Sequence, residues 1–179
     1  ATRSSEALSE LPYAASLLEQ SFLDNRQFRT LPDVFQEVPG VLVQKTAHGH
    51  GSPYIRNFTG RQNLLLVDGI RMNNSTWRSG PVQYWNTFDR ENLSSIEVIK
   101  GQGSVLYGSD AIGGTVSLQS KSSGFRQESG GLFYHGRGHF RYDTNSRSQV
   151  GRIEQSFGFG GQWGAQLGVS VKDFGDIKD

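Results

Sequence analysis

Two histidines separated by one glycine, His48-Gly49-His50, have side chains that could bind a metal ion or a haem iron. Imidazole nitrogens suit both kinds of centre. A solvent-exposed loop with two polar residues explains the same pattern. We expect such a loop here, predict no metal site, and keep His48 and His50 as candidate ligand-facing residues.

The acidic residues indicate no catalytic chemistry. Five carboxylates lie in predicted turns or beside predicted strands, with no nucleophile or base paired to them: Asp68, Asp89, Glu91, Glu97 and Asp110. The chain contains no cysteine, no Walker sequence, no G-x-S-x-G elbow and no H-E-x-x-H motif. We therefore predict no catalytic residue, no cofactor and no enzyme activity, unless an acid and a base meet in a cleft.

The nearest approach to a nucleotide-binding motif is the hexapeptide GQGSVL at residues 101–106. It lacks the third glycine of the dinucleotide fingerprint, and we expect a second strand rather than a helix to follow it. Residues 95–119 instead show two β-type runs, 96–99 and 115–118, around a glycine-rich core with interleaved apolar residues. This pattern predicts a compact strand–loop–strand unit packed into something larger.

The longest irregular segment, residues 73–86, concentrates aromatic rings and a cation: Trp77, Arg78, Tyr84 and Trp85. Exposed aromatic rings beside an arginine offer flat contact area and a positive charge, which is typical of a binding surface. Packing of some of these rings against neighbouring parts of the protein is an equally good explanation. Both interpretations stay open at this point.

The composition excludes several classes of protein. The 179 residues include 18 basic and 17 acidic side chains, a net charge of +1, which gives no electrostatic case for nucleic acid. No run of about eighteen apolar residues is present, so the sequence predicts no transmembrane helix, while transmembrane strands leave a weaker trace. The 23 glycines and many aromatic residues favour a sheet protein.

Residues 1–121 have a mixed α/β pattern. A hydroxyl followed by Leu-Pro-Asp at Thr30 predicts the start of a helix, and Asp24 or Asn25 could cap a short helix before it. The continuous apolar run at residues 64–67 predicts a strand buried on both faces. Further predicted elements are short strands at residues 14–18 and 41–43 and a glycine-rich loop at residues 48–53. We predict an α+β domain with a small mixed sheet and short helices.

Residues 122–179 change to long alternating segments, 131–143, 147–159 and 162–172, joined by short turn signals. Alternating segments of about ten residues are typical of an outer-membrane barrel, although a half-buried soluble sheet gives the same alternation. Three antiparallel strands leave open edges that need partners. We therefore expect the chain to continue beyond Asp179.

Three blocks of the sequence resemble the plug domain of TonB-dependent outer-membrane receptors. They are LPDVFQEVPGVLV at residues 31–43, YIRNFTGRQNLLLVDGIRMN at residues 54–73, and SIEVIKGQGSVLYGSDAIGGTVSL at residues 95–118. The blocks follow the family's order and spacing. The resemblance implies a plug domain followed by the first antiparallel strands of a transmembrane β-barrel.

The resemblance also assigns roles to particular cations. Plug arginines in the last two blocks are expected to contact the barrel wall, which points to Arg56, Arg61 and Lys100. Lys100 replaces the family's arginine and keeps the charge without the bidentate fork. Asn57 replaces the usual glycine after the "IR" pair, which predicts a tighter turn there.

A receptor of this family would take up a scarce nutrient across the bacterial outer membrane. The resemblance implies a ferric siderophore or haem as cargo, a TonB-type periplasmic energy-coupling protein as partner, and contact with outer-membrane lipid. Vitamin B12 or an oligosaccharide is an alternative cargo within the family. A soluble binding or adhesion module, with an α/β head and a β-meander, is the alternative outside it.

Overall fold

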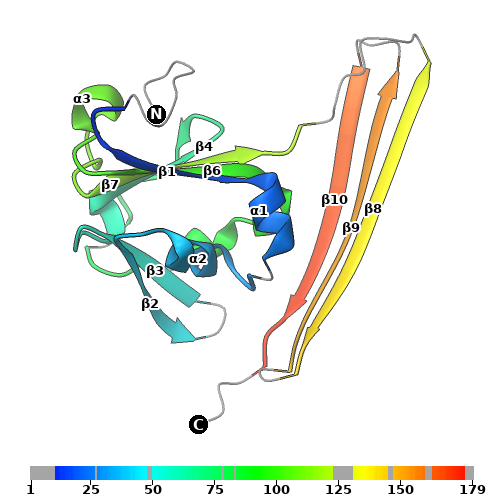
Figure 1. Ribbon diagram of the computed structural model, residues 1–179, viewed down its shortest axis with the longest axis horizontal. Coiled ribbons are helices and arrows are strands. Elements are labelled where there is room, and N and C mark those ends of the chain that lie inside the picture. Colours follow the sequence, from blue (N-terminus) through cyan, green and yellow to red (C-terminus); the bar gives the residue numbers. More distant parts are fainter. Residues whose placement is uncertain are drawn as a thin grey trace. The chain divides into compact units, whose positions relative to one another are not determined.

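The computed structural model describes residues 11–26, 28–47, 50–77, 79–82, 84–122, 131–144, 147–159 and 163–175. The chain divides into two compact units, Ala1–Ser120 and Lys121–Asp179 (Figure 1). The first unit combines two sheets with short helices, and the second contains three long strands.

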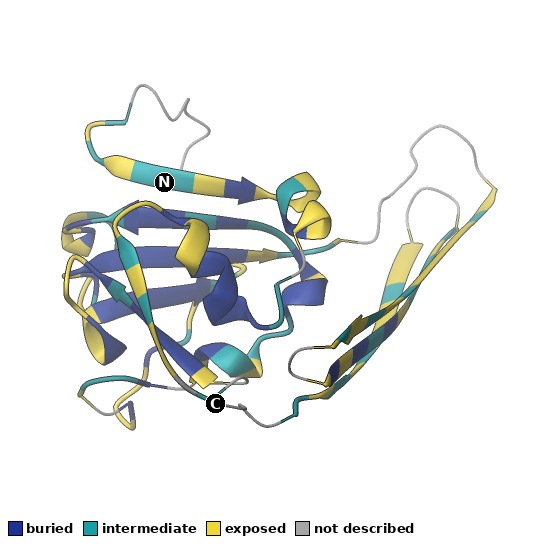
Figure 2. Ribbon diagram, turned by 60° about the horizontal axis from the view of Figure 1, so that its bottom comes forward, coloured by how far each residue is buried: buried dark blue, intermediate teal, exposed yellow. Residues whose placement is uncertain are grey.

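The first unit is built on a five-stranded sheet with the order β1-β6-β7-β4-β5. Its strands are β1 (Ala14–Glu19), β4 (Asn63–Val67), β5 (Ile70–Arg71), β6 (Leu93–Lys100) and β7 (Gly114–Ser120). Strand β4 pairs with β7 in parallel, and the other pairs are antiparallel. The side chains of Leu64 and Leu65 are fully buried, which confirms the prediction of a strand covered on both faces. In Figure 2 the central strands of this sheet are buried along most of their length.

A second, two-stranded sheet is formed by β2 (Val41–Ala47) and β3 (His50–Ile55). The prediction of a loop over residues 48–53 was therefore wrong from His50 onward. Gly51 is a strand residue, and a Cβ there would lie 2.8 Å from Cβ of Pro32. This glycine marks a close approach between the hairpin and the preceding helical region around Pro32 rather than a loop.

The helices are short. They are α1 (Gln20–Asn25), α2 (Leu31–Val34) and α3 (Ser104–Tyr107), with 3₁₀ turns η2 (Phe35–Glu37), η3 (Gly60–Gln62), η4 (Tyr84–Thr87) and η5 (Arg90–Asn92). Thr30 is the N-cap of α2 and forms a capping box with Asp33, which confirms the predicted helix start. Asp24 and Asn25 lie at the end of α1, whose N-cap is Glu19, so the predicted cap was wrong.

Helix α3 begins inside the hexapeptide at residues 101–106, where no helix was expected, and the expected strand, β7, follows it. It is a single turn of four residues, and Gly108 ends it with φ at +82°. The third glycine of the dinucleotide fingerprint is still missing. The stretch therefore remains a tight connection between β6 and β7.

The core of the first unit lies between the two sheets and the helices that accompany them. Phe35 and Trp85 are fully buried and meet edge to face, with ring centroids 5.5 Å apart. Other core members come from several helices, strands and loops of the unit: Leu18, Leu23, Leu31, Val34, Val38, Ile55, Leu65, Trp77, Val82, Leu93, Ile96, Val98, Val116 and Leu118. Burial of aromatic rings of this size is a large part of the stability of a small domain.

Gly113, just before β7, and Gly114, its first residue, lie against the second sequence block without room for a side chain. A Cβ on Gly113 would lie 2.4 Å from both Phe58 Cβ and Asn63 Oδ1, and one on Gly114 would lie 2.8 Å from Ile55 Cγ2. Only glycine permits this approach, because real Cβ contacts are longer. The pair Gly113-Gly114 therefore lets β7 enter the sheet beside β4.

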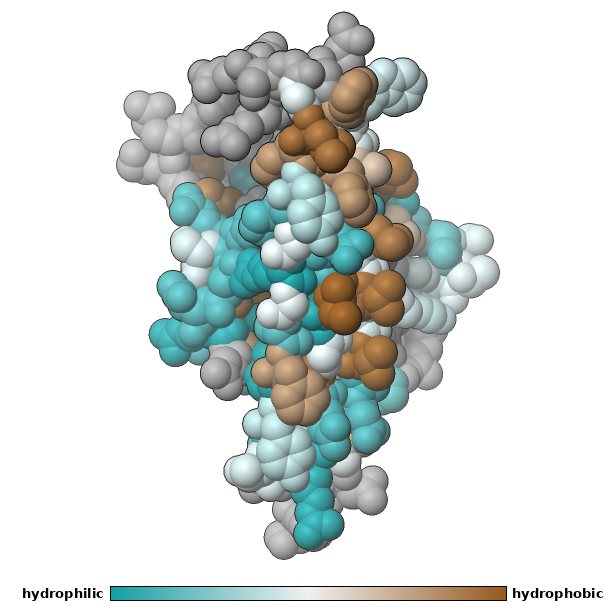
Figure 3. Space-filling view, turned by 90° about the vertical axis from the view of Figure 1, so that its right-hand side faces the viewer, coloured by the Kyte–Doolittle hydropathy of each residue, from teal (hydrophilic) through white to brown (hydrophobic). Residues whose placement is uncertain are grey.

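The second unit is an antiparallel sheet of β8 (Leu132–Asp143), β9 (Ser148–Phe159) and β10 (Trp163–Asp173), with β9 in the centre. Regular pairing without a register shift confirms the three predicted alternating strands. One face carries exposed apolar side chains, which Figure 3 shows as a hydrophobic band: Leu132, Tyr134, Phe140, Tyr142, Ile153, Phe157, Phe159, Trp163, Leu167, Val169 and Val171. Within the part of the chain that the structure describes, no helix is long and apolar enough to cross a membrane.

Replacing Gly113 with alanine should weaken the pairing of β7 by about 1–3 kcal/mol, because the new methyl group overlaps Phe58 and Asn63. Hydrogen exchange of β7 amides in the full-length protein should then accelerate roughly 5- to 150-fold. Gly69→Ala is the contrasting variant, since Gly69 has φ at +81° but open space around it. That variant should affect its own turn by about 1 kcal/mol and leave β7 protected. Equal exchange of β7 in both variants would contradict the steric argument.

Candidate functional site around Tyr84 and Arg56

Tyr84 and Trp77 form a stacked pair in the irregular segment between β5 and η5. Their ring centroids are 5.3 Å apart and their planes differ by 26°. Trp77 is buried, at 5% exposure, whereas Tyr84 is 42% exposed. Tyr84 thus presents one exposed ring that is supported from behind by a core residue, which restricts its motion before any ligand arrives.

The segment that carries this pair is fixed to the sheets at several points. The side chain of Asn73 accepts a hydrogen bond from the Leu65 amide at 2.9 Å and donates one to the Asn63 carbonyl at 3.0 Å. The Val82 amide donates a hydrogen bond to Ser52 Oγ at 3.2 Å. The backbones of Gly60 and Gly80 lie so close together that a Cβ on Gly60 would be only 2.1 Å from the Gly80 carbonyl oxygen. The segment is therefore a packed loop on a rigid support, a common arrangement for binding residues.

The aromatic residues of this segment divide between the core and the surface. Trp85 has no exposed area and packs on Phe35, and Trp77 is nearly as buried. The expectation that these two rings face a ligand is corrected, because their apolar surface is already used in the core. Tyr84 is the aromatic side chain of the predicted set that the structure leaves accessible.

The predicted histidine pair is only partly described. His50 begins β3, pairs with Ala47 and is exposed. His48 and Arg78 lie outside the described residues. No group of three or more histidine, aspartate or glutamate side chains that could hold a metal ion occurs among the residues that the structure describes.

Arg56 is the most unusual of the three predicted wall-facing cations. Arg56 and Asn57 both have positive φ, at 51° and 67°, and form a two-residue turn closed by hydrogen bonds between Ile55 and Phe58 of 2.9 and 3.0 Å. Asn57 suits this conformation, whereas an arginine there is strained. Strained residues cluster at functional sites.

The Arg56 guanidinium reaches the third sequence block. A Cβ on Gly101 would lie 2.9 Å from Arg56 Nη1, so the arginine passes over the Gly101 backbone, where φ is +120°. Arg56 is exposed, and no described residue makes a polar contact with its guanidinium in this structure. The second and third blocks, separate in sequence, therefore meet at this point.

Arg61 and Lys100 differ from Arg56 in their surroundings. Arg61 lies in η3 and is exposed. The Lys100 ammonium donates to the Pro39 carbonyl at 2.9 Å and lies 3.3 Å from Ser16 Oγ. Lys100 thus links β1, β6 and the turn before β2, which gives it partners inside the first unit.

Arg71 is a positioning residue that the sequence did not single out. Its guanidinium donates to the carbonyls of Tyr107 and Ser109 at 2.7 and 2.9 Å, to Ser109 Oγ at 2.9 Å, and to Asp110 at 3.2 Å. One side chain therefore holds the whole connection between α3 and β7. The fork geometry of arginine suits several acceptors at once.

Arg90 performs a similar task for the N-terminal part of the unit. It forms a buried ion pair with Glu91 and donates to the carbonyls of Leu23 and Arg26 at 3.0 and 3.2 Å. These carbonyls belong to the C-terminal end of α1, where the helix leaves acceptors unsatisfied. Arg90 thus ties α1 to the start of β6.

The polar face of the second unit contains one described glutamate, Glu154 on β9. Arg152 donates to its Oε2 from Nε and Nη2, at 3.0 and 2.6 Å, and also to Ser170 Oγ at 2.9 Å. Lys121 lies 3.5 Å from the same carboxylate oxygen. Glu154 is therefore stabilised as an anion within its own unit.

Comparison with known proteins places the chain in a family. The family model described as TonB-dependent Receptor Plug Domain matches residues 7–115, more than half of the chain. A protein of Vibrio vulnificus (strain CMCP6) named "Vitamin B12 transporter BtuB" is 36% identical over 125 residues, which is 69% of this chain and 20% of that protein. The "Iron-regulated outer membrane virulence protein" of Vibrio cholerae is 34% identical over 119 residues, covering 63% and 18%. The chain therefore spans about a fifth of the length of these relatives.

Solved structures agree with this assignment at the level of the fold. The siderophore receptor PiuA from Acinetobacter baumannii has a TM-score of 0.64 at 23% identity, covering 90% of this chain and 21% of that one. The P. aeruginosa receptor FpvA, bound to a heterologous pyoverdine, has a TM-score of 0.69 at 19% identity, covering 92% and 21%. The chain belongs to the TonB-dependent receptors of the bacterial outer membrane, a family of receptors rather than enzymes, and it has the plug fold followed by barrel strands.

Replacing Arg71 with lysine should loosen the α3–β7 connection, because a single ammonium cannot serve four acceptors in the geometry of the guanidinium. Loss of one or two hydrogen bonds should accelerate amide exchange at residues 107–111 roughly 5- to 30-fold in the full-length protein. Ile70→Ala, at the exposed neighbouring position, is the matched control and should leave this exchange unchanged. Wild-type protection in the Arg71→Lys variant would exclude the proposed positioning role.

Proposed function

We propose that this chain is the plug and the first wall strands of a receptor that takes up an iron-bearing cargo, a ferric siderophore or haem, across the outer membrane. The observation that carries the proposal is the exposed Tyr84 ring, stacked on buried Trp77 within a plug fold. A flat, pre-positioned ring favours a cargo with planar conjugated groups, because offset stacking adds to simple burial of area. A catecholate and a porphyrin both have such groups.

Vitamin B12 is the second candidate cargo. The relative in Vibrio vulnificus that is named as a vitamin B12 transporter supports it, and a corrin ring also offers a broad surface to Tyr84. The Vibrio cholerae relative named as iron-regulated and the Yersinia pestis relative named "Hemin receptor" support the iron-bearing cargo. One binding experiment can distinguish the iron-bearing cargo from vitamin B12.

Transport by such a receptor depends on a plug that can rearrange. We propose that a TonB-type periplasmic protein supplies the energy through the N-terminal part of the chain, and that Arg56, Arg61 and Lys100 contact the barrel wall. The turn of Arg56 is exposed and strained, which supports a role beyond folding. Hydrated polar contacts can rearrange at modest cost, unlike a dry apolar interface.

Calorimetric titration of the full-length receptor with a ferric catecholate, a ferric hydroxamate, haemin and cyanocobalamin tests the cargo class. Saturable binding of a ferric siderophore or haemin at submicromolar concentration is the expected result. Binding of cyanocobalamin alone would replace the iron-bearing cargo by the second candidate. Binding of none of them by folded receptor would overturn the Tyr84 site as proposed.

Tyr84→Ala should weaken cargo binding about 5- to 30-fold, the value of one stacked aromatic contact. Tyr84→Phe should bind within about twofold of wild type, because it keeps the ring and loses only the hydroxyl. The same titration measures both. Equal loss in the alanine and phenylalanine variants would show that the hydroxyl, and not stacking, carries the contact.

Arg56→Gly separates the wall contact from folding. It removes the guanidinium and relieves the positive φ, so the plug should be as stable as wild type or more stable by about 1 kcal/mol. The outer membrane should nevertheless become permeable to a large antibiotic such as vancomycin, as the plug is held less firmly. Asn57→Gly is the matched control, since it relieves the neighbouring φ and keeps the charge. Wild-type permeability in Arg56→Gly cells would remove Arg56 from the proposed contact.

A further inference from the structure

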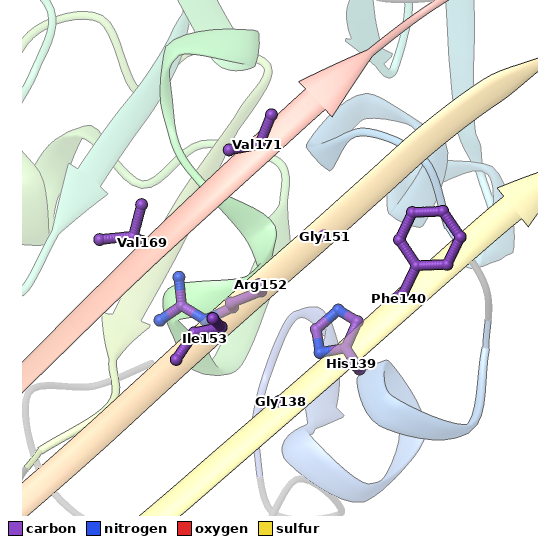
Figure 4. A pocket seen from close by; sticks show the side chains of 8 residues that line it. All are labelled: Gly138, His139, Phe140, Gly151, Arg152, Ile153, Val169 and Val171. Carbon is purple, nitrogen blue, oxygen red and sulfur yellow. The ribbon is translucent and has the colours of Figure 1, made fainter.

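The second unit has a cavity of about 390 Å³, but this cavity does not suit a polar cargo. It is lined by four apolar side chains (Figure 4): Phe140, Ile153, Val169 and Val171. Strand alternation places the side chains of His139 and Arg152, which also border it, on the opposite face. A polar cargo would lose its hydrogen bonds to water there without replacement. A hydrophilic cargo needs a polar surface, and one face of the five-stranded sheet in the first unit provides it.

This face of the sheet carries a polar lane along β7. Thr115, Ser117 and Gln119 alternate along the strand and lie opposite the residues that β7 contributes to the core. On the neighbouring strand β6, Glu97 pairs with Ser117 and Ser95 pairs with Gln119. Gln119 is exposed, Ser117 is buried, and Thr115 has no exposed area. The lane is therefore open at the end of β7 and covered at its start.

The segment that covers the lane is the connection between β6 and β7, residues 101–113, which we call the strap. The Gly103 backbone lies directly against Thr115, because a Cβ on Gly103 would be 2.8 Å from Thr115 Oγ1. The Thr115 hydroxyl is buried and has no hydrogen-bond partner among the described residues. A buried polar group without a partner costs free energy, and water can supply the partner once the strap lifts. Opening the strap therefore removes one cost of the closed position.

The strap has the construction of a flap that can move in one piece. It is connected internally by hydrogen bonds of 2.8 Å from the Gly101 amide to the Gly113 carbonyl and 2.9 Å from the Gly103 amide to the Ala111 carbonyl. Its apolar contact with the sheet is a small cluster that is separate from the main core: Leu64, Leu66, Tyr107 and Ala111. The strap can therefore lift while the main core stays closed.

The strap is fixed at its base and latched at its tip. At the base, Gly101 has φ at +120°, and the Gly113 amide donates to the Gln62 carbonyl at 3.0 Å. At the tip, the Arg71 guanidinium binds two carbonyls, one hydroxyl and the Asp110 carboxylate. Arg71 is exposed and belongs to the edge strand β5. Release of one exposed side chain therefore frees the tip, and the base remains as a hinge.

We propose that the strap is a flap with Arg71 as its latch, and that its opening extends the polar lane along the whole of β7 for the passage of a hydrophilic cargo. The inference rests on the proposed function, which makes the first unit the plug of an uptake receptor. It assigns the movement to one segment of the plug. The hydroxyl, amide and carboxylate groups of the lane can replace the hydrogen bonds that polar groups of the cargo make with water.

Cysteine labelling of the purified full-length receptor, in a background free of other reactive cysteines, tests the flap without any cargo. Thr115→Cys places a thiol beneath the strap, and Val116→Cys places one in the core on the opposite face; both positions are fully buried. Combining Thr115→Cys with Arg71→Gln should accelerate its labelling by a water-soluble maleimide about tenfold, because hydrogen bonds of the latch are lost. Val116→Cys should stay unlabelled in both backgrounds.

Equal labelling of Thr115→Cys with and without Arg71 would overturn the latch. Equal labelling at Thr115→Cys and Val116→Cys would overturn the flap, since the whole unit would then open. Ser117→Cys, further along the same lane, serves if the Thr115→Cys variant does not fold.

Crosslinking tests whether the flap must open for uptake. Arg71→Cys and Ser109→Cys, joined by a bis-thiol crosslinker that a reductant cleaves, replace the latch with a covalent bridge. Cells given haemin or a ferric catecholate as iron source should lose uptake about tenfold or more, keep surface binding of the same compound, and recover uptake on cleavage. The same crosslinker across Asp68→Cys and Ser120→Cys is the matched control. These two residues make hydrogen bonds of 2.8 Å at the other end of β7, so the control should leave uptake unchanged.

Wild-type uptake by the receptor crosslinked at residues 71 and 109 would overturn the flap, as would an equal loss in the control crosslinked at residues 68 and 120. Failure of the receptor to bind either compound before crosslinking would reject the cargo proposal alone. The maleimide labelling needs no cargo, so it still decides whether the flap opens.

Discussion

The first unit depends on the close approach of the turn at residues 55–58 to the start of β7. A side chain on Gly113 or Gly114 would collide with Ile55, Phe58 or Asn63. Because β7 lies between β6 and β4, this approach decides whether the five-stranded sheet can form in its observed order. It also brings Arg56 over Gly101, so the exposed cation and the sheet are fixed by the same contact.

Two kinds of interaction hold the unit together, and they occupy different places. The core around Phe35 and Trp85 is apolar and closely packed, which resists any partial rearrangement. The connections at its margins are held by single polar side chains, Arg71 on the α3–β7 connection and Arg90 on α1. Arg71 is exposed, so its connection can be released without opening the core, whereas Arg90 and its partner Glu91 are buried. The proposed rearrangement of the plug within the wall would use this separation between core and margins.

The sequence was most informative where local chemistry decides structure. The hydroxyl and proline at residues 30–32 fix a helix start, and the apolar run at residues 64–67 could only be a covered strand. It was least informative where a residue acts over a distance. Gly51 has the pattern of a loop residue, but it serves a close approach to Pro32. Asn73 has the pattern of a turn residue, but its side-chain amide bonds to the backbone of Leu65 and Asn63 on β4. Nothing local distinguishes these roles, because the partners come from other parts of the chain.

The candidate site also depends on contacts between distant residues, which the local sequence does not reveal. The aromatic and cationic residues of this segment left a binding surface and internal packing equally open, and the core takes Trp77 and Trp85 and leaves Tyr84 accessible. Burial of the tryptophans is not a loss to the site, because Trp77 supports the ring that remains exposed. A single ring on a rigid support discriminates by shape rather than by total area, since it cannot adapt to a cargo without a flat face. In the proposed site, selectivity therefore depends on the buried residues as much as on the exposed one.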